Sequence, residues 1–263
     1  MDDMETFDED KDRQFVNALA RGLELLRCFR PGEVFLSNAE LARRCSLAKP
    51  TVTRLTYTLT RLGYLHYSEA QGKYQLGPGV LALGYRMLST LDLRAMARPL
   101  MAELAEYAQA SVSLGARDRL KMVYLETCRS SANVTLRLDV GSRIPLATTA
   151  MGKALLCALP QPERDYLMDH MRRKDKELWP KVKAGIEQGF RDYQDRGFTI
   201  SAGEWQNDVH AVGVPVLDVN GEQLMAFNCG GPAFLLPRER LEEDLGPRLA
   251  RLARTIDSNL GRI

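Results

Sequence analysis

The sequence predicts an α+β protein in which a small winged helix-turn-helix domain is joined by a helix to a larger domain. Three observations support this prediction. Residues 15–77 carry a helix-turn-helix pattern followed by a hairpin pattern, and residues 78–92 form an apolar helical segment. Residues 93–263 then alternate helical and strand-like patterns, without a glycine-rich phosphate-binding loop.

The composition excludes several classes of protein. Of the 263 residues, 45% are hydrophobic and 27% are charged, which is ordinary for a globular domain. There is no run of about 18 apolar residues, and the N-terminal MDDMETFDEDKD lacks the basic start and apolar core of a signal peptide. The five cysteines and three histidines have no zinc-site spacing. We therefore expect a reduced, cytoplasmic protein without a metal or another cofactor, and no contact with membranes.

The charges are distributed unevenly along the chain. Residues 1–12 contain seven acidic residues and one lysine, and we expect an acidic tail, 1–14, to be disordered. Residues 13–78 carry ten basic and four acidic residues, whereas residues 79–263 carry 25 basic and 23 acidic residues. A strongly basic segment in a nearly neutral chain is typical of a domain that binds a polyanion.

The first helices are predicted from apolar spacing and capping residues. Residues 15–29 place a stripe on one helical face, made of Val16, Leu19, Leu23, Leu26 and Phe29. The motif SNAE at 37–40 is a capping box that starts a short helix, which should bury Leu41 and Ala42 and end near Cys45. The turn SLAK follows, with Leu47 filling the space between helices, and Pro50 favours the start of the next helix.

That next helix, KPTVTRLTYTLTRLGYL at 49–65, is unusually rich in threonine, a mediocre helix former. Its buried stripe should comprise Val52, Leu55, Leu59 and Leu62, with Thr56 and Thr60 packing beside it. In a helix-turn-helix the second helix enters the major groove, where hydroxyls bind phosphates and arginines bind guanine. The expected exposed side of the helix carries Thr51, Thr53, Arg54, Tyr57, Thr58 and Arg61.

A β-hairpin completes the winged helix, since Leu65, Tyr67, Tyr74 and Leu76 alternate with polar residues around the turn EAQGK. We expect Lys73 at the tip of the wing. With Arg43, Lys49 and Lys73 added to the exposed residues of the preceding helix, the candidate interface binds double-stranded DNA. The alternative is a winged helix that makes only protein contacts.

The segment GPGVLALGYRMLSTLDL at 77–93 predicts a connecting helix with a broad apolar stripe. The stripe comprises Val80, Leu81, Gly84, Met87, Leu88 and Leu91. Either this face is buried against the same chain, or it pairs with a second copy in a dimer, which we favour because one winged helix makes few contacts.

The second domain begins with a predicted helix at 93–109, on the stripe Met96, Leu100, Leu104 and Tyr107. A hairpin at 111–128, a third strand NVTLRL, helices at 148–159 and 161–196, a hairpin at 210–231 around Asn220–Gly221, and a final amphipathic helix follow. Within it, TTAMGKA at 148–154 is a candidate ligand site. Thr148 or Thr149 caps a helix, whose amides at Ala150, Met151 and Gly152 suit a carboxylate.

The chain resembles the IclR family of bacterial transcription regulators over about residues 15–260. The resemblance rests on LARGLELLRCF, LSNAELARRCSLAKPTVTRLTYTLTRLGYL and YQLGPGVLALG in the first part of the chain. It continues in IPLATTAMGKALLCALP, RGFTISAGEWQNDVHAVGVPVLDVNGE and LMAFNCGGPAF. It implies a C-terminal domain with a curved antiparallel sheet flanked by helices, related to GAF domains. It also implies a dimer or tetramer that binds a palindromic operator and senses a small organic metabolite, often a carboxylate or an aromatic compound.

The resemblance also implies an effector site. Backbone amides of TTAMGKA would cradle the effector, and Leu136 and Ile144 would supply an apolar wall. Family positions for polar side chains fall on Ser201, Ala211, Asn228 and Gly230. Ser201 replaces an acid, Ala211 a thiol and Gly230 a hydroxyl of the glyoxylate-type pattern. These departures favour a larger, partly apolar carboxylate over a very small keto acid.

Two other functions remain open. Cys229, His210 and Glu204 lie on neighbouring predicted strands and could form a thiol nucleophile, base and orienting acid of a hydrolase. A strand cysteine is usually a small buried hydrophobe, however, so we expect no enzyme. The other alternative is a constitutive architectural DNA-binding protein whose second domain serves only oligomerisation.

Overall fold

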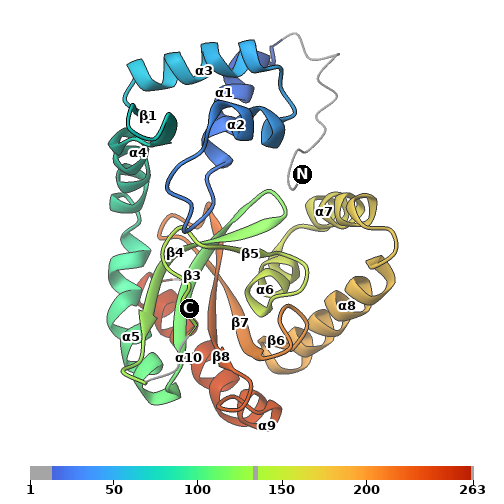
Figure 1. Cartoon of the computed structure of the whole chain (residues 1–263). Helices are drawn as coiled ribbons and strands as arrows, with labels where there is room; N and C mark the ends of the chain where they lie inside the picture. The colour runs from blue at the N-terminus through green and yellow to red at the C-terminus, as the bar shows by residue number, and fades with distance from the viewer. Residues whose placement is uncertain (1–13, 133–135, 262–263) are drawn as a thin grey trace. The chain divides into compact units, whose positions relative to one another are not determined.

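The computed structural model describes residues 14–132 and 136–261. The chain divides into two compact units, Met1–Thr90 and Leu91–Ile263, which are treated separately below (Figure 1). The predicted disordered tail falls, apart from residue 14, outside the described residues. Within the described ranges, no helix combines the length and the apolar character needed to cross a membrane.

The first unit is a winged helix-turn-helix. Its elements are α1 (Asn17–Arg27), α2 (Asn38–Cys45), α3 (Lys49–Arg61), β1 (Leu65–Ser68), β2 (Lys73–Leu76) and α4 (Pro78–Ser89). The predicted capping box starts α2: Ser37 Oγ accepts a hydrogen bond from the Glu40 amide at 3.2 Å, and the Glu40 carboxylate accepts one from the Ser37 amide at 2.8 Å. Both groups satisfy amides that the first helical turn leaves without partners.

The core of this unit differs from the expected stripe of α1. Leu25 is fully buried with Leu41 and Val52, whereas Val16, Leu19 and Leu23 are 60%, 62% and 52% exposed. The buried residues of α1 are Gly22 and Leu25, and Gly22 faces Leu55 of α3. The expected burial of Leu62 is also wrong, since α3 ends at Arg61 and Leu62 is 63% exposed.

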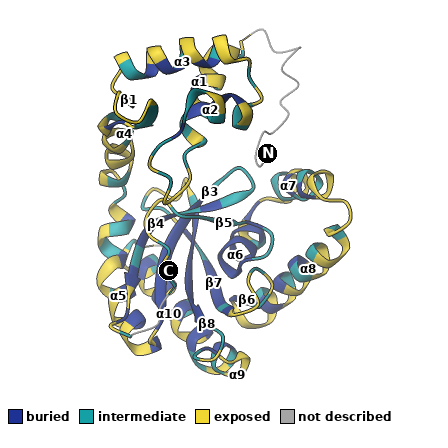
Figure 2. Ribbon diagram, viewed as in Figure 1, coloured by how far each residue is buried: buried dark blue, intermediate teal, exposed yellow. Residues whose placement is uncertain are grey.

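The wing is a two-stranded antiparallel hairpin in which Leu65 pairs with Leu76 and Ser68 pairs with Lys73. Leu36, before α2, adds an isolated bridge to Tyr74 through two backbone hydrogen bonds of 2.8 and 2.9 Å. The wing is thereby attached to the segment that leads into the helix-turn-helix. After the wing, α4 has no buried residue in the described chain and carries Leu81 and Tyr85 at 74% and 65% exposure (Figure 2).

The second unit is built on a six-stranded antiparallel sheet with the order β5-β4-β3-β8-β7-β6. The strands are β3 (Ser111–Asp118), β4 (Lys121–Arg129), β5 (Arg143–Pro145), β6 (Thr199–Ala202), β7 (Val209–Leu217) and β8 (Leu224–Pro232). The expected strand at 133–138 is wrong where it can be judged: residues 136–138 form no strand, and 133–135 lie outside the described residues. Instead, β5 pairs with β4 through Met122 and Ile144.

Helices cover this sheet and establish the predicted α+β class. They are α5 (Asp92–Ala108), α6 (Ala150–Ala158), α7 (Gln161–Lys174), α8 (Trp179–Arg196), α9 (Arg238–Arg240) and α10 (Gly246–Asn259), with a π-helical turn at Leu241–Leu245. The helix α6 lies against the inner strands, and it is nearly as buried as the sheet itself (Figure 2). The helices α5 and α10 also pack on the sheet and on each other.

The buried stripe of α5 differs by one position from the expected one. It contains Leu93, Ala97, Met101, Leu104 and Ala108, whereas Tyr107 is 49% exposed. Tyr107 instead stacks under the guanidinium of Arg248, 3.8 Å from the ring centre. Small alanines on the buried side allow α5 to lie close to the sheet, so the most apolar residues of the helix are not all inside.

Candidate nucleic-acid interface and ligand cavity

The exposed side of α3 is the candidate nucleic-acid interface. Thr53, Arg54, Tyr57, Thr58 and Arg61 are exposed there, and Tyr57 is 67% accessible. On the opposite side, Val52, Thr56 and Leu59 are buried in the core of the first unit. The helix is therefore held by one face and presents hydroxyls, one aromatic ring and cations on the other.

The exposed threonine hydroxyls are already engaged. Thr53 Oγ1 donates to the Lys49 carbonyl at 3.0 Å and accepts from Asn38 Nδ2 at 3.1 Å. Thr58 Oγ1 donates to the Arg54 carbonyl at 3.0 Å. To donate to a phosphate, either hydroxyl must turn away from its own helix. A threonine side chain also carries a methyl group, which can make apolar contact with a thymine methyl.

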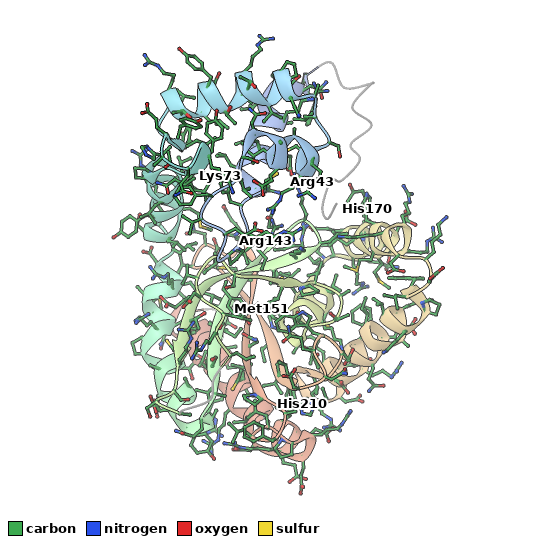
Figure 3. All side chains as sticks on the ribbon, viewed as in Figure 1. Arg43, Lys73, Arg143, Met151, His170 and His210 are labelled. Atoms are coloured by element: carbon green, nitrogen blue, oxygen red, sulfur yellow. The ribbon has the colours of Figure 1, made fainter. Side chains whose placement is uncertain are left out.

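The other residues predicted to contact DNA, among them Arg43 and Lys73, differ in their exposure to solvent (Figure 3). Arg43 and Lys49 are exposed, and Thr51 is partly exposed. Lys73 is partly buried at the start of β2, so the wing tip is the turn at 69–72 rather than Lys73 itself. Glu40 lies near Lys73: hydrogen bonds from Ser37 lower the pKa of Glu40, and the charge of Lys73 lowers it further.

A small, partly open cavity in the second unit has about 20 Å³ of free space, room for about one water molecule. Six predicted effector residues line it: Leu136, Ile144, Ala150, Ser201, Ala211 and Asn228. They come from β5, β6, β7, β8, the start of α6 and the chain before β5. Strand register brings three of these residues close together. Ser201 pairs with Ala211, and Ala211 pairs with Gly230, two residues after Asn228.

The predicted residues Met151, Gly152 and Gly230 do not line the cavity. Met151 is fully buried in the core, where Gly115 leaves room for its sulfur (Figure 3). Gly152 presses against the backbone of Leu146, and its amide donates to Thr149 Oγ1 at 3.2 Å. Gly230 lies beside Ala211, where a Cβ would come within 3.0 Å of the alanine methyl.

Four further cavity residues were not expected from the sequence as wall residues: Tyr124, Thr149, Trp205 and Val209. Tyr124 fits the alternating pattern of its strand, but the sequence does not say which face of the sheet borders the cavity. Trp205 stands in a loop, SAGEWQND, which carries no periodic pattern. Of the two threonines, Thr149 is the cap, and its hydroxyl also donates to the Pro145 carbonyl at 2.7 Å.

The polar atoms of the cavity are mostly paired. Ser201 Oγ donates to the Thr148 carbonyl at 2.8 Å, and Asn228 Nδ2 donates to the Tyr124 hydroxyl at 3.2 Å. Burial raises the pKa of Tyr124, so the phenol stays neutral. Asn228 Oδ1 is buried and has no hydrogen-bond partner among the described residues. A buried acceptor without a hydrogen-bond partner favours binding of a ligand that carries a hydrogen-bond donor.

An ion pair between the buried Lys153 and the solvent-exposed Glu204 holds the loop that forms one wall. Lys153 of α6 is fully buried, and its Nζ lies 2.5 Å from Glu204 Oε1 and donates to the Ile200 carbonyl at 3.1 Å. Burial lowers the pKa of Lys153, while the Glu204 carboxylate opposes that shift. Glu204 precedes Trp205, so the pair holds this tryptophan against the cavity. A lysine within the apolar run AMGKALL was the sequence signal for such a pair.

The thiol-hydrolase alternative is wrong. Cys229 is fully buried, and burial raises the pKa of its thiol to about 12. His210 Nδ1 is 2.8 Å from the Leu236 carbonyl, and Glu204 is engaged by Lys153 (Figure 3). These three groups therefore form no nucleophile, base and orienting acid.

Comparison with known proteins gives two family matches. Residues 18–69 match the IclR helix-turn-helix domain, and residues 85–258 match the C-terminal domain described as bacterial transcriptional regulator IclR C-terminal. The HTH-type transcriptional regulator TsaQ1/TsaQ2 of Comamonas testosteroni is 34% identical over 247 residues, covering 93% of this chain and 88% of its own. The Pca regulon regulatory protein of Pseudomonas putida is 27% identical, with 93% and 84% covered.

Solved structures agree. An IclR family transcriptional regulator from Brucella abortus is 50% identical, with a TM-score of 0.88 and 95% and 94% of the two chains covered. An IclR homologue from Microbacterium hydrocarbonoxydans, solved in complex with 4-hydroxybenzoate, is 19% identical with a TM-score of 0.68, covering 94% of this chain and 100% of that one. The latter is similar in fold.

Proposed function

The chain belongs to the IclR family of DNA-binding transcriptional regulators, and from this premise we propose that it binds a palindromic operator and is controlled by a small aromatic acid. Its relatives are regulators rather than enzymes, and its C-terminal domain is the effector-binding domain of the family. The observation that carries the ligand proposal is the cavity that joins apolar walls to a helix N-terminus and an unpaired amide oxygen.

DNA binding is proposed to use the exposed side of α3. Arg54 and Arg61 would reach phosphates or guanine edges, while the methyl groups of Thr53 and Thr58 would contact thymine methyls. Lys49 and Arg43 would contribute charge at the border of this surface. The exposure of these side chains and the local excess of basic residues support this assignment.

A palindromic operator requires a symmetric dimer. The support for a dimer is the exposed apolar surface of α4, where Leu81, Leu83, Tyr85 and Met87 are 74%, 52%, 65% and 41% accessible. Exposed apolar side chains clustered on one short helix mark an association surface rather than a solvated one. Because a palindromic operator has twofold symmetry, the partner of this surface would be α4 of a second copy of the chain.

The chemistry of the cavity lining supports a ligand with one ring. In this structure the free space is about 20 Å³, room for about one water molecule, so the walls have to move apart to admit a ring. Ile144, Leu136 and Trp205 would contact the ring, and the positive end of α6 at Ala150 would attract the carboxylate. Asn228 Oδ1 would accept a hydrogen bond from a ring hydroxyl. The 4-hydroxybenzoate complex of the Microbacterium homologue gives an example of this ligand class.

The ligand proposal is tested by thermal unfolding with benzoate, 4-hydroxybenzoate and glyoxylate. A ligand that binds only the folded protein raises Tm by mass action. We expect the largest rise with 4-hydroxybenzoate, a smaller rise with benzoate and none with glyoxylate. A rise with glyoxylate alone would reverse the ligand class, and no rise with any organic acid tried would favour the ligand-independent DNA-binding alternative.

The operator proposal is tested by selection from random DNA duplexes, with the bound fraction recovered at moderate salt. We expect enrichment of an inverted repeat whose half-sites lie whole helical turns apart. Enrichment of a single, non-repeated site would contradict the dimeric mode of binding.

A further inference from the structure

Two cysteines of the first unit form a close thiol pair that DNA recognition does not use. Cys28 follows α1 as its C-cap, and Cys45 is the last residue of α2. Their sulfur atoms are 3.0 Å apart, although both thiols are free and the residues are 17 positions apart in the chain. Both residues are only partly buried, so small solutes have access to this part of the unit.

Charges of both signs surround the pair, with Arg44 and Arg30 favouring a thiolate at Cys28 and Glu24 opposing it. Arg44 Nη1 donates to the Cys28 carbonyl at 2.7 Å, and the same guanidinium is held by two bonds to Glu33. The hydrogen bond from Cys45 lowers the pKa of the Cys28 thiol, and the charges of Arg44 and Arg30 lower it further. The same hydrogen bond raises the pKa of Cys45. Cys28 is therefore the more acidic thiol of the pair, and Cys45 is the one that keeps its proton to higher pH.

The three remaining cysteines have raised thiol pKa values. Burial raises the pKa values of Cys128, Cys157 and Cys229, the last two to about 12. Cys128 and Cys157 donate to backbone carbonyls of Arg98 and Gly189 at 3.6 and 3.7 Å. A thiol that is protonated and bonded to a carbonyl reacts slowly with oxidants, because the thiolate is the nucleophile. These three serve as internal references for the pair.

We propose that Cys28 and Cys45 are a redox-active pair that a hydroperoxide oxidises reversibly to a disulfide within the helix-turn-helix. The Cys28 thiolate attacks one peroxide oxygen, the O–O bond breaks, and Cys28 becomes a sulfenic acid as hydroxide leaves. Cys45 sulfur then attacks the Cys28 sulfur, the S–O bond breaks, and water is released. Two thiols and one hydrogen peroxide give one disulfide and two waters.

The geometry requires little movement. A disulfide needs a sulfur separation of about 2.05 Å, so each sulfur has to move by roughly half an ångström. The bond would close the loop that contains α2 and the core residues Leu36 and Leu41. It would also fix the end of α2 to the end of α1, immediately before the turn into α3. Oxidation therefore restricts the relative motion of the three helices that present the DNA-reading side chains.

The experiment uses the full-length reduced protein, treated with a small excess of hydrogen peroxide, quenched, and mapped by mass spectrometry without reductant. We expect a peptide pair linked through Cys28 and Cys45, with three of the five thiols still free after denaturation. The linkage should form at least about tenfold faster than Cys157 or Cys229 is oxidised, because thiolate fraction controls the rate. Dithiothreitol should restore all five thiols.

Variants separate this reaction from general oxidation. Cys45→Ser should stop at a sulfenic acid on Cys28, which dimedone traps, and Cys28→Ser should leave Cys45 unmodified. Cys157→Ser is the matched control and should form the linkage at the wild-type rate. Five free thiols after methionine oxidation has begun, or a Cys28 linkage only between two protein chains, would overturn the proposal.

Discussion

At the residue scale, α3 shows why its exposed threonines and arginines have different parts in recognition. Thr53 and Thr58 donate their hydroxyl hydrogens to carbonyls of their own helix, so in this state neither hydroxyl is free to donate to a phosphate. Arg54 and Arg61 extend from the same side with five donors each. We therefore expect sequence discrimination by this helix to depend chiefly on arginine contacts.

Replacing Arg54 with alanine tests this division. If Arg54 binds a base edge, the change should cost about 1–3 kcal/mol of specific binding and relax one position of the site. Fluorescence anisotropy on the selected operator and on single-base variants gives both values. Arg254→Ala removes the same charge from an exposed arginine of α10 and should change neither. Unchanged operator affinity in Arg54→Ala would remove this residue from the interface.

Asn228 decides, on our proposal, between ligands of similar size in the cavity. Its Oδ1 lacks a partner, so a ring hydroxyl gains a hydrogen bond that a bare ring does not. Asn228→Ala should weaken binding of the hydroxylated acid by about 0.5–1.5 kcal/mol, or about two- to tenfold, with little change for its unhydroxylated analogue. Isothermal titration calorimetry with both ligands measures the difference. Equal losses for the two acids would show that Asn228 acts on the cavity shape alone.

At the scale of elements, glycines determine how α6 docks on the sheet. A Cβ on Gly213 of β7 would come within 2.4 Å of the Ala150 carbonyl oxygen. A Cβ on Gly152 would come within 2.0 Å of the Leu146 carbonyl oxygen. Both neighbours are backbone atoms, which side-chain rotation cannot move. Because the start of α6 forms one wall of the cavity, this docking also sets the position of the ligand site.

Gly152→Ala should therefore lower the free energy of unfolding by about 1–3 kcal/mol, even though alanine favours helix. Gly22→Ala in α1 is the matched control. Its Cβ would meet Leu55 Cδ2 at 3.8 Å, an ordinary van der Waals contact that requires no movement. Urea denaturation followed by circular dichroism compares them. A similar loss in both variants would mean that helix packing in general, rather than the backbone contact, is responsible.

The helix α4 is the other element with a specific expectation, because its apolar residues are exposed in the described chain. Leu81→Glu places a charge on the proposed dimer surface and should dissociate the protein at micromolar concentration without unfolding it. Ala82→Glu adds the same charge on the side shared with Arg86 and should leave assembly intact. Sedimentation velocity resolves the species. A wild-type monomer that still binds an inverted repeat tightly would contradict the assignment.

At the scale of the whole molecule, regulation requires that the ligand cavity and the DNA-reading helix influence each other. The segment from α4 to α5 is the covalent connection between the two units. In a dimer, a ligand that changes the separation of the two α3 helices changes affinity, because half-sites lie whole turns apart. Such coupling has to be reciprocal, since both effects describe one thermodynamic cycle.

We expect operator DNA to change ligand affinity by the same factor by which ligand changes operator affinity, with a coupling of about 1–3 kcal/mol. Calorimetric titration of the aromatic acid into free and operator-bound protein measures the first factor, and anisotropy with and without ligand measures the second. Asn228→Ala should shift the ligand concentration needed while leaving operator affinity without ligand unchanged. Identical ligand affinity for free and bound protein would show that this ligand does not control DNA binding.

Local patterns in the sequence were sufficient for the α+β class and for the capped helix at Ser37. They also sufficed for the threonine helix and for most of the antiparallel pairing, because caps, turns and periodicities act over a few residues. Resemblance to the family, rather than a local pattern, pointed to six of the residues that line the cavity. Local patterns failed where packing overrode apolarity, as in α1, where Leu19 and Leu23 are exposed and Leu25 is buried.

Only the tertiary structure decided which side chains meet. Trp205 reaches the cavity because Glu204 is held by a buried lysine 51 residues earlier, and no local pattern encodes that pairing. The side chain of Met151, whose backbone amide was expected in the cradle, lies in the core, where Gly115 leaves space for its sulfur. Cys28 and Cys45 approach to 3.0 Å because α1 and α2 pack at their C-terminal ends. Sequence determines elements through short-range energetics, whereas sites depend on contacts between distant residues that exist only once the elements have packed.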